Sequence, residues 1–278
     1  METENLLRTE IVHGVSMMRK IIDSHIHLDQ YEKQDLNRII EGDPSIEALI
    51  AVSFDLKSCK ATQEIASRYQ QVYTAYGYHP EQPLPHENEL IELINWMDHH
   101  QSEMIAIGEV GLPYYLRQEQ DLLLEPYLEL LEEMTIKAKE WQKPLVLHAV
   151  YEDAKIVCDL LEKHSISKAH FHWFKGDERT VERMIQNGYF ISITPDVLYE
   201  KDIKELVKKY PLEQIMVETD GPWPFEGPFT GRQTHPQMIH ISIEEIARLK
   251  RVPISDVYSV VRENTIKFYN LRESEGEQ

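Results

Sequence analysis

Cysteine is scarce in this chain: only Cys59 and Cys158 occur among its 278 residues. The two lie far apart, in segments that read as helices, and show none of the close spacing of a cysteine metal site. The scarcity argues against a fold held by disulfides and against a cysteine zinc site. We expect both thiols to be reduced packing residues, which is the common intracellular state.

Long hydrophobic runs are also missing. No stretch approaches the roughly 20 apolar residues that a membrane-spanning helix needs, and the first 16 residues lack the apolar core of a secretory signal. We therefore expect a cytoplasmic protein without membrane attachment. Residues 1–16 read as a short flexible tail, unless Met17 or Met18 is the native start, and residues 273–278 read as an acidic tail that frays.

Basic side chains are outnumbered, since 29 Lys and Arg face 48 Asp and Glu and the formal net charge is -19. The average surface field therefore repels polyanions. A long, non-specific grip on duplex DNA draws its affinity from lysines and arginines at phosphates, so the composition argues against it. A metal pocket can still bind one phosphate locally, because a bound cation dominates the field around it.

The chain does contain a regular succession of short aliphatic runs and amphipathic stretches. The runs predict eight strands, near residues 20–24, 48–54, 72–77, 104–108, 144–148, 168–172, 189–193 and 214–218. The amphipathic stretches predict helices over 58–69, 87–100, 126–141, 153–164, 177–187 and 201–209, with two closing helices at about 236–250 and 255–271. Strand starts lie roughly 28 residues apart, the size of a βα repeat. We therefore predict an α/β fold, a (β/α)8 TIM barrel with extra C-terminal helices, as a single domain over residues 17–272.

Metal-ligand side chains follow several of the predicted strands. His25 and His27 alternate along the first strand, so both imidazoles point to one side and can bind one cation. Four further candidates each follow a short aliphatic run: Glu109, His148, His172 and Asp220. Strand ends of an α/β barrel meet on one face, and such groups are costly to bury unpaired, so together they predict a metal centre. Mixed imidazole and carboxylate ligation suits Zn or Mn and tolerates Mg with water.

Six short motifs occur in order along the chain: IIDSHIHLD at the first strand, GYHP at 77–80, IGEVGL at 107–112, PLVLHA around His148, HWFKG at 172–176 and VETDGP at 217–222. In this order and spacing, from about Ile21 to Leu271, the chain resembles the TatD-type metal-dependent hydrolases, also described as TatD DNases. The resemblance implies two divalent metal ions (Mg, Mn or Zn). It also implies hydrolysis of phosphodiester bonds in DNA, often from a 3′ end, on single-stranded or frayed substrate.

The resemblance further implies how the two ions are held. His25 and His27, with Glu109 and Asp220, hold one ion, and Glu109 bridges it to a second ion held with His148 and His172. Asp220 orients or deprotonates the water that such an ion pair activates, so Asp220 and Glu109 are the candidate catalytic residues.

Two alternatives to this ligand set are open. Some related amidohydrolases bridge their metals with a carbamylated lysine, but no lysine stands beside Glu109 or His148, which favours the TatD-type arrangement. His170 alternates with His172 and competes with it as a ligand. The resemblance favours His172, which aligns with the family's histidine before an aromatic residue and a glycine.

Three residues are candidates for substrate contact. His79 in GYHP is a pocket residue or a turn residue, and Lys175 and Arg232 are the basic residues expected to meet a phosphate, unless they are solvated loop charges. The family pattern is broken on this side: Pro113 stands where Asp is common, residues 232–236 replace Arg-Asn-Glu-Pro, and HAVYEDA at 148–154 lacks the usual arginine. Hydrolysis is therefore better supported than the identity of the substrate.

Three functions remain open on the sequence. The first is a metal-dependent deoxyribonuclease or phosphodiesterase acting on single-stranded DNA. The second is an amidohydrolase or esterase for a small substrate, favoured by the missing arginine and the acidic surface. The third is a non-catalytic barrel whose acidic surface docks a basic protein partner.

Overall fold

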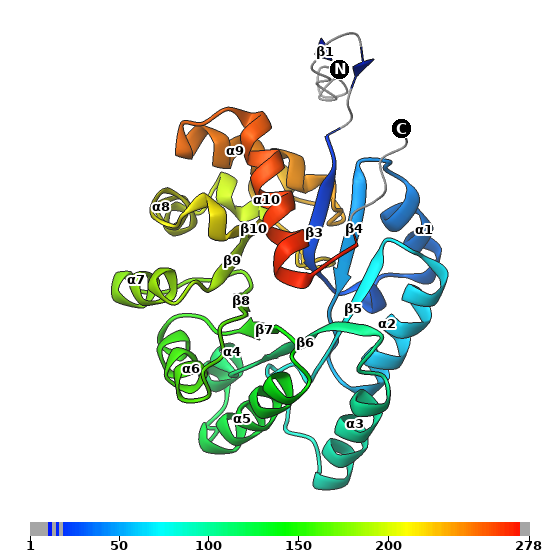
Figure 1. Cartoon of the computed structure of the whole chain (residues 1–278), viewed down its shortest axis with the longest axis vertical. Coiled ribbons are helices and arrows are strands. Elements are labelled where there is room, and N and C mark those ends of the chain that lie inside the picture. Colours follow the sequence, from blue (N-terminus) through cyan, green and yellow to red (C-terminus); the bar gives the residue numbers. More distant parts are fainter. Residues whose placement is uncertain (1–10, 13–14, 17–18, 273–278) are drawn as a thin grey trace.

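Eight parallel strands form a nearly closed barrel in the computed structural model, which describes residues 11–12, 15–16 and 19–272 (Figure 1). Strands that are neighbours in sequence are neighbours in the barrel, and every strand pair within it is parallel. The strands are β3 (Ile21–Ile26), β4 (Ile46–Ala51), β5 (Val72–Tyr76), β6 (Met104–Gly111), β7 (Leu145–His148), β8 (Ala169–Phe171), β9 (Phe190–Ile193) and β10 (Ile215–Val217). The predicted TIM barrel is confirmed, and each predicted strand overlaps an observed one.

Helices surround the strands on the outside (Figure 1). They are α1 (Lys33–Glu41), α2 (Leu56–Arg68), α3 (Glu87–His99), α4 (Tyr114–Glu119), α5 (Glu125–Glu140), α6 (Glu152–Lys163), α7 (Glu178–Gln186), α8 (Lys201–Lys209), α9 (Met238–Lys250) and α10 (Ile254–Tyr269). The helix pattern of the sequence predicted all of these except α1 and α4. Short 3-10 turns add η1 (Leu28–Gln30), η2 (Pro195–Leu198), η3 (Leu212–Gln214) and η4 (Gly227–Phe229).

Two short strands precede the barrel, β1 (Ile11–Val12) and β2 (Val15–Ser16), which pair antiparallel with each other. They fall within the predicted N-terminal tail. The rest of that tail, the two candidate start methionines and the predicted acidic tail at 273–278 lie outside the described residues.

The barrel closes where its first strand meets the segment after its last strand. The backbone N–H of Asp220 donates to the carbonyl of His25 at 3.0 Å, and the N–H of His27 donates to the carbonyl of Gly221 at 2.7 Å. The buried Asp23 carboxylate accepts from the Thr219 backbone N–H at 3.0 Å and from its hydroxyl at 2.5 Å. This seam holds Asp220 beside His25 in β3 and His27 directly after it.

Apolar side chains fill both faces of the strands, which is why the strands read as nearly continuous hydrophobic runs. Alternate residues face inward, and those inside the barrel include the small side chains of Ala48, Ala75 and Ala106 beside larger ones such as Ile22 and Met216. The end of α10 packs against β3 and β10 and contributes Ile266 and Phe268 to this inner cluster. The strand starts are thus covered, and the strand ends form the open face of the barrel.

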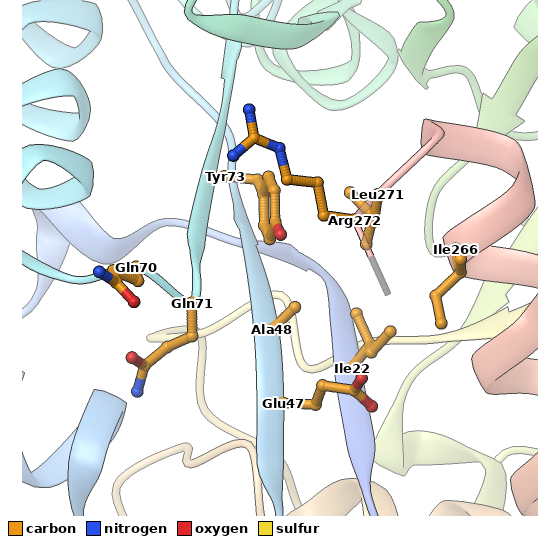
Figure 2. A pocket seen from close by; sticks show the side chains of 9 residues that line it. All are labelled: Ile22, Glu47, Ala48, Gln70, Gln71, Tyr73, Ile266, Leu271 and Arg272. Carbon is orange, nitrogen blue, oxygen red and sulfur yellow. The ribbon is translucent and has the colours of Figure 1, made fainter. Parts of the chain in front are cut away.

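A hollow of about 610 Å³ lies at the covered end, among the strand starts and the end of α10 (Figure 2). Its lining includes Tyr73, Gln71 and Arg272, and none of the six metal-ligand candidates. Both cysteines are buried and unpaired, as predicted for packing residues. In the part of the chain that the structure describes, no helix has the length and apolar character to cross a membrane.

Candidate metal centre

All six predicted ligands are buried and meet at the open face of the barrel. Five separate segments bring them there: β3 with the residue after it, β6, the end of β7, and the residues that follow β8 and β10. They are His25, His27, Glu109, His148, His172 and Asp220. Convergence of imidazoles and carboxylates from five segments is what a metal centre requires of a barrel of this type.

Four ligand atoms form a first group. The Nε2 atoms of His25 and His27 lie 3.4 Å apart, and Glu109 Oε2 lies 3.1 and 3.3 Å from them. Asp220 Oδ1 lies 3.3 Å from each Nε2. Four ligands held about 2.0–2.1 Å from a tetrahedral centre would lie about 3.4 Å from one another. The spacing of these atoms therefore fits a single divalent ion.

Two of these acceptors lack the partners that buried carboxylate oxygens normally have. Glu109 Oε2 and Asp220 Oδ1 are buried, and neither accepts a well-formed hydrogen bond from any group in the described part of the chain. Leaving such atoms unpaired is costly. A cation between them and the two imidazoles would satisfy both.

The other oxygen of Glu109 faces a second group. Oε1 lies 2.6 Å from His172 Nε2 and 3.0 Å from His148 Nδ1, and these two nitrogens are 3.3 Å apart. His79 Nε2 lies 3.4 Å from the same oxygen. Glu109 thus presents one oxygen to each group, which is the arrangement of a bridging carboxylate.

Burial and charge compete at this site. Burial alone would raise the pKa of Asp220, but His25 and His27 outweigh it and hold that pKa well below its usual range. Burial likewise opposes ionisation of Glu109, yet the surrounding imidazoles, His172 foremost, keep its pKa low. The same carboxylates raise the pKa of His27 to about 9 against the effect of its burial. Both carboxylates are therefore ionised at neutral pH, as metal ligands must be.

Sequence reasoning missed a carboxylate at the edge of this site. Glu81 Oε1 accepts from His148 Nε2 at 3.0 Å, and its two oxygens accept the backbone N–H groups of Tyr115 and Leu116 at 2.9 and 2.7 Å. Tyr115 and Leu116 lie in the first turn of α4. The only signal was an acidic residue two positions after His79, and nothing in the sequence linked it to His148.

His170 lies one layer deeper in the barrel than His172. Its Nδ1 is 2.7 Å from the Tyr269 hydroxyl and its Nε2 is 2.6 Å from the Ser192 hydroxyl. The structure thus places His172, and not His170, beside Glu109. A second carboxylate that the sequence did not single out, Glu218, accepts the Ser192 hydroxyl at 2.5 Å and the backbone N–H of Trp173 at 2.7 Å.

A cavity of about 430 Å³ opens directly over the two groups. His79 lines it, next to five of the six ligand candidates. Tyr115, Trp173 and Trp223 supply aromatic walls.

The two predicted basic contacts do not reach this cavity. Lys175 lies outside the lining, with its Nζ 3.8 Å from Asp196 and 5.4 Å from the ring centre of Trp173. Arg232 is exposed on the loop after β10. Among the residues that the structure describes, no lysine or arginine lines the cavity. Their predicted phosphate contacts stay predictions, without support from this geometry.

The sequence profile of the TatD-related DNases matches residues 22–270. An uncharacterized metal-dependent hydrolase of Haemophilus influenzae is 39% identical over 253 residues, which cover 90% of this chain and 100% of that protein. The human deoxyribonuclease TATDN3 is 28% identical over 90% of this chain and 94% of its own length. The crystal structure of YjjV, a TatD homologue from Escherichia coli, shares the fold with a TM-score of 0.80 at 23% identity, over 92% of this chain and 100% of that one.

Proposed function

Because this chain belongs to the family of TatD-related DNases, a family of metal-dependent hydrolases, we propose that it cleaves phosphodiester bonds at single-stranded or frayed DNA ends with two divalent metal ions. The observation that carries the proposal is the placement of Glu109. Its two oxygens face two separate groups of ligand atoms under one cavity.

Each group of side chains would hold one ion. His25, His27, Glu109 and Asp220 would hold the first, and Glu109, His148 and His172 the second. When bound, two such ions activate a water and stabilise the charge that develops on a phosphoryl oxygen.

Asp220 is the side chain best placed to handle the proton of the attacking water. It lines the cavity, and the neighbouring imidazoles hold the pKa of its carboxyl low, so the carboxylate is ionised and can accept a hydrogen bond from that water. His79 lies on the same wall, where burial lowers its pKa. A neutral imidazole there can donate or accept a hydrogen bond from substrate.

The shape and charge of the site favour a strand end over a duplex. The ligand atoms lie at the bottom of a recess, and among the described residues no lysine or arginine lines it to track a second strand. The same lack of basic side chains supports a second candidate, an amidohydrolase or esterase acting on a small substrate. The cytoplasmic location inferred from composition stays a prediction, as does any protein partner.

The decisive experiment combines metal analysis with substrate digestion on one preparation. We expect close to two metal ions per chain and cleavage of single-stranded oligonucleotides with Mg, Mn or Zn that a chelator abolishes. The variant His25→Ala/Glu109→Ala should lose both metal and cleavage. A matched control is Glu132→Ala/His164→Ala, which removes a His–Glu pair on the outer surface whose Nε2 and Oε1 lie 2.6 Å apart.

Two results would redirect the proposal. Full oligonucleotide cleavage by His25→Ala/Glu109→Ala would exclude these residues as its source. Metal binding without oligonucleotide cleavage, but with turnover of amides or lactones, would establish the small-substrate hydrolase instead.

A further inference from the structure

Aromatic rings are left in solvent around the mouth of the cavity. Tyr115 is 46% exposed and Trp223 is 45% exposed, and both line it. A third ring on its wall, Trp173, is partly buried. Folding favours burial of such large apolar surfaces. Exposed aromatic side chains that surround one cavity therefore indicate that a ligand binds there.

The three rings come from separate segments that also carry or hold ligand candidates. Tyr115 lies on α4, where its backbone N–H binds Glu81, and its ring centre is 6.1 Å from that of His148. Trp173 directly follows His172. Trp223 follows Asp220 by three residues, and the backbone N–H of Trp223 donates to the backbone carbonyl of Asp220 at 3.2 Å. The backbone that carries each ring thus lies close to the ligand groups.

Trp173 is anchored at both ends. Its indole N–H donates to Asp196 Oδ2 at 2.6 Å, and its backbone N–H donates to Glu218 at 2.7 Å. Its ring centre lies 5.7 Å from that of Phe225, which is buried. A ring held in this way presents a rigid surface to the cavity and loses little conformational entropy when a ligand packs on it.

The charge of the cavity lining argues against a different mode of binding. A strand whose phosphates were tracked by the protein would need lysines or arginines along its path. No lysine or arginine among the described residues lines the cavity, whereas the carboxylate of Glu81 does. Stacking of bases on aromatic rings needs no positive charge and tolerates any sequence, because every base has a flat face.

We propose that Tyr115, Trp173 and Trp223 form a stacking site for one unpaired nucleobase next to the phosphate that is cleaved. This inference rests on the proposed phosphodiesterase function and adds its substrate class: phosphoesters that carry a single free base. The cavity volume of about 430 Å³ lies near the lower end of the range of about 300–1,000 Å³ for small-ligand sites. A cavity of this size holds one terminal nucleotide, and the other nucleotides of a strand add little to the binding affinity.

Binding can be tested without turnover. Calorimetry would compare deoxyadenosine monophosphate with deoxyribose 5-phosphate, which matches it in phosphate and sugar but lacks the base, on metal-free and on zinc-loaded protein. We expect tighter binding of the nucleotide in both forms. Trp223→Leu should weaken nucleotide binding by about 5- to 100-fold, the effect of losing one base–ring stack, and leave deoxyribose 5-phosphate unchanged.

Two further variants separate stacking from damage to the fold. Trp223→Tyr keeps a ring and should retain most of the preference for the base. Tyr73→Leu removes a partly exposed ring at the opposite end of the barrel and should change nothing (Figure 2). Equal binding of the two probes by the wild-type protein would overturn the stacking site, as would an unchanged preference in Trp223→Leu.

Cleavage kinetics provide a second test of the stacking site. Oligonucleotides with a natural or an abasic terminal residue, and of two to twenty nucleotides, would be compared by kcat/KM on the metal-loaded enzyme. We expect the abasic end to be cleaved at least several-fold less well, and length to have little effect. An equal kcat/KM for natural and abasic ends would overturn the stacking site but would still support the phosphodiesterase function. If no oligonucleotide is cleaved, the proposed phosphodiesterase function is wrong. The binding comparison then tests the stacking site by itself.

Discussion

Glu81 binds the ring nitrogen of His148 that points away from Glu109. His148 Nε2 lies 3.0 Å from Glu81 Oε1, and the opposite nitrogen, Nδ1, lies 3.0 Å from Glu109 Oε1. When Nε2 carries the proton and donates it to Glu81, Nδ1 is left with its lone pair directed into the second ligand group. Burial opposes ionisation of Glu81, but His148 lowers its pKa below the usual value, so it serves as a charged acceptor.

Removal of this carboxylate should weaken metal binding without removing a ligand. In Glu81→Ala, we expect affinity for the second ion to fall by about 10- to 100-fold, the usual effect of losing such a supporting partner. Competition with a chromogenic chelator would measure it. Glu132→Ala is the matched control, because Glu132 pairs with His164 far from the site and its loss should leave metal affinity unchanged. Wild-type affinity in Glu81→Ala would show that His148 needs no such support.

Metal removal should lower thermal stability. An ion that binds only the folded chain adds about 2.7 kcal/mol when its free concentration is 100 times its dissociation constant. The ligand atoms come from five segments of the barrel, so the unfolded chain cannot reproduce the site. We expect a Tm several degrees higher with metal than with chelator in differential scanning calorimetry. The variant His25→Ala/Glu109→Ala should have the same Tm with metal and with chelator. A wild-type Tm that the chelator does not change would contradict the metal centre.

The parts of the fold and site that the sequence predicted share a simple physical cause. Each barrel strand is buried on both faces, so it appears as an aliphatic run, and a ligand at its end appears as a polar interruption. α4 was missed because none of its residues is buried and it has no apolar stripe. Glu81 was missed because its partner His148 is 67 residues away. The direction in which the side chains of Lys175 and Arg232 point depends on loop conformation, and the periodicity of apolar residues in the sequence carries no information on loops.

Acid should weaken one surface pair in a defined pH range. Arg183 donates to both oxygens of Glu162 at 2.7 Å, and these hydrogen bonds, together with one from Asn187 at 2.7 Å, lower the pKa of Glu162 from 4.5 to about 2. A lowered pKa stabilises the folded chain above the unfolded value, and that stabilisation is lost as pH falls from about 4.5 toward 2. The pair is exposed, so the free energy is at most about 1 kcal/mol.

Urea unfolding of wild type and Arg183→Met at several pH values between 7 and 3 would check this. The wild type should be the more stable of the two at pH 7, and the difference should shrink below about pH 4.5 as the unfolded chain takes up its proton. Lys60→Met is a control, because the Lys60 Nζ lies 3.7 Å from Glu92 in a looser exposed pair. A difference that stays constant down to pH 3 would show that the Arg183 contact does not depend on the charge of Glu162.

The Tyr269 hydroxyl supports the buried His170 inside the barrel. Burial holds the pKa of His170 well below its usual value, so the ring stays neutral, and both of its nitrogens are hydrogen-bonded, at 2.7 Å to Tyr269 and 2.6 Å to Ser192. Tyr269→Phe leaves Nδ1 of His170 without a partner. We expect a loss of about 1–3 kcal/mol in the free energy of unfolding, which is the cost of an unsatisfied buried polar group.

Tyr258→Phe is the comparison for this loss, because the Tyr258 hydroxyl bonds His240 Nδ1 at 2.6 Å at a site where the imidazole is only partly buried. Water can replace the lost partner there, so the cost should be smaller than for Tyr269→Phe. Both variants should keep full metal content, since His170 lies outside the two ligand groups. A Tyr269→Phe protein that is as stable as Tyr258→Phe but has lost metal would instead mean that the hydroxyl acts on the ligands through His170, and would place His170 in the metal centre.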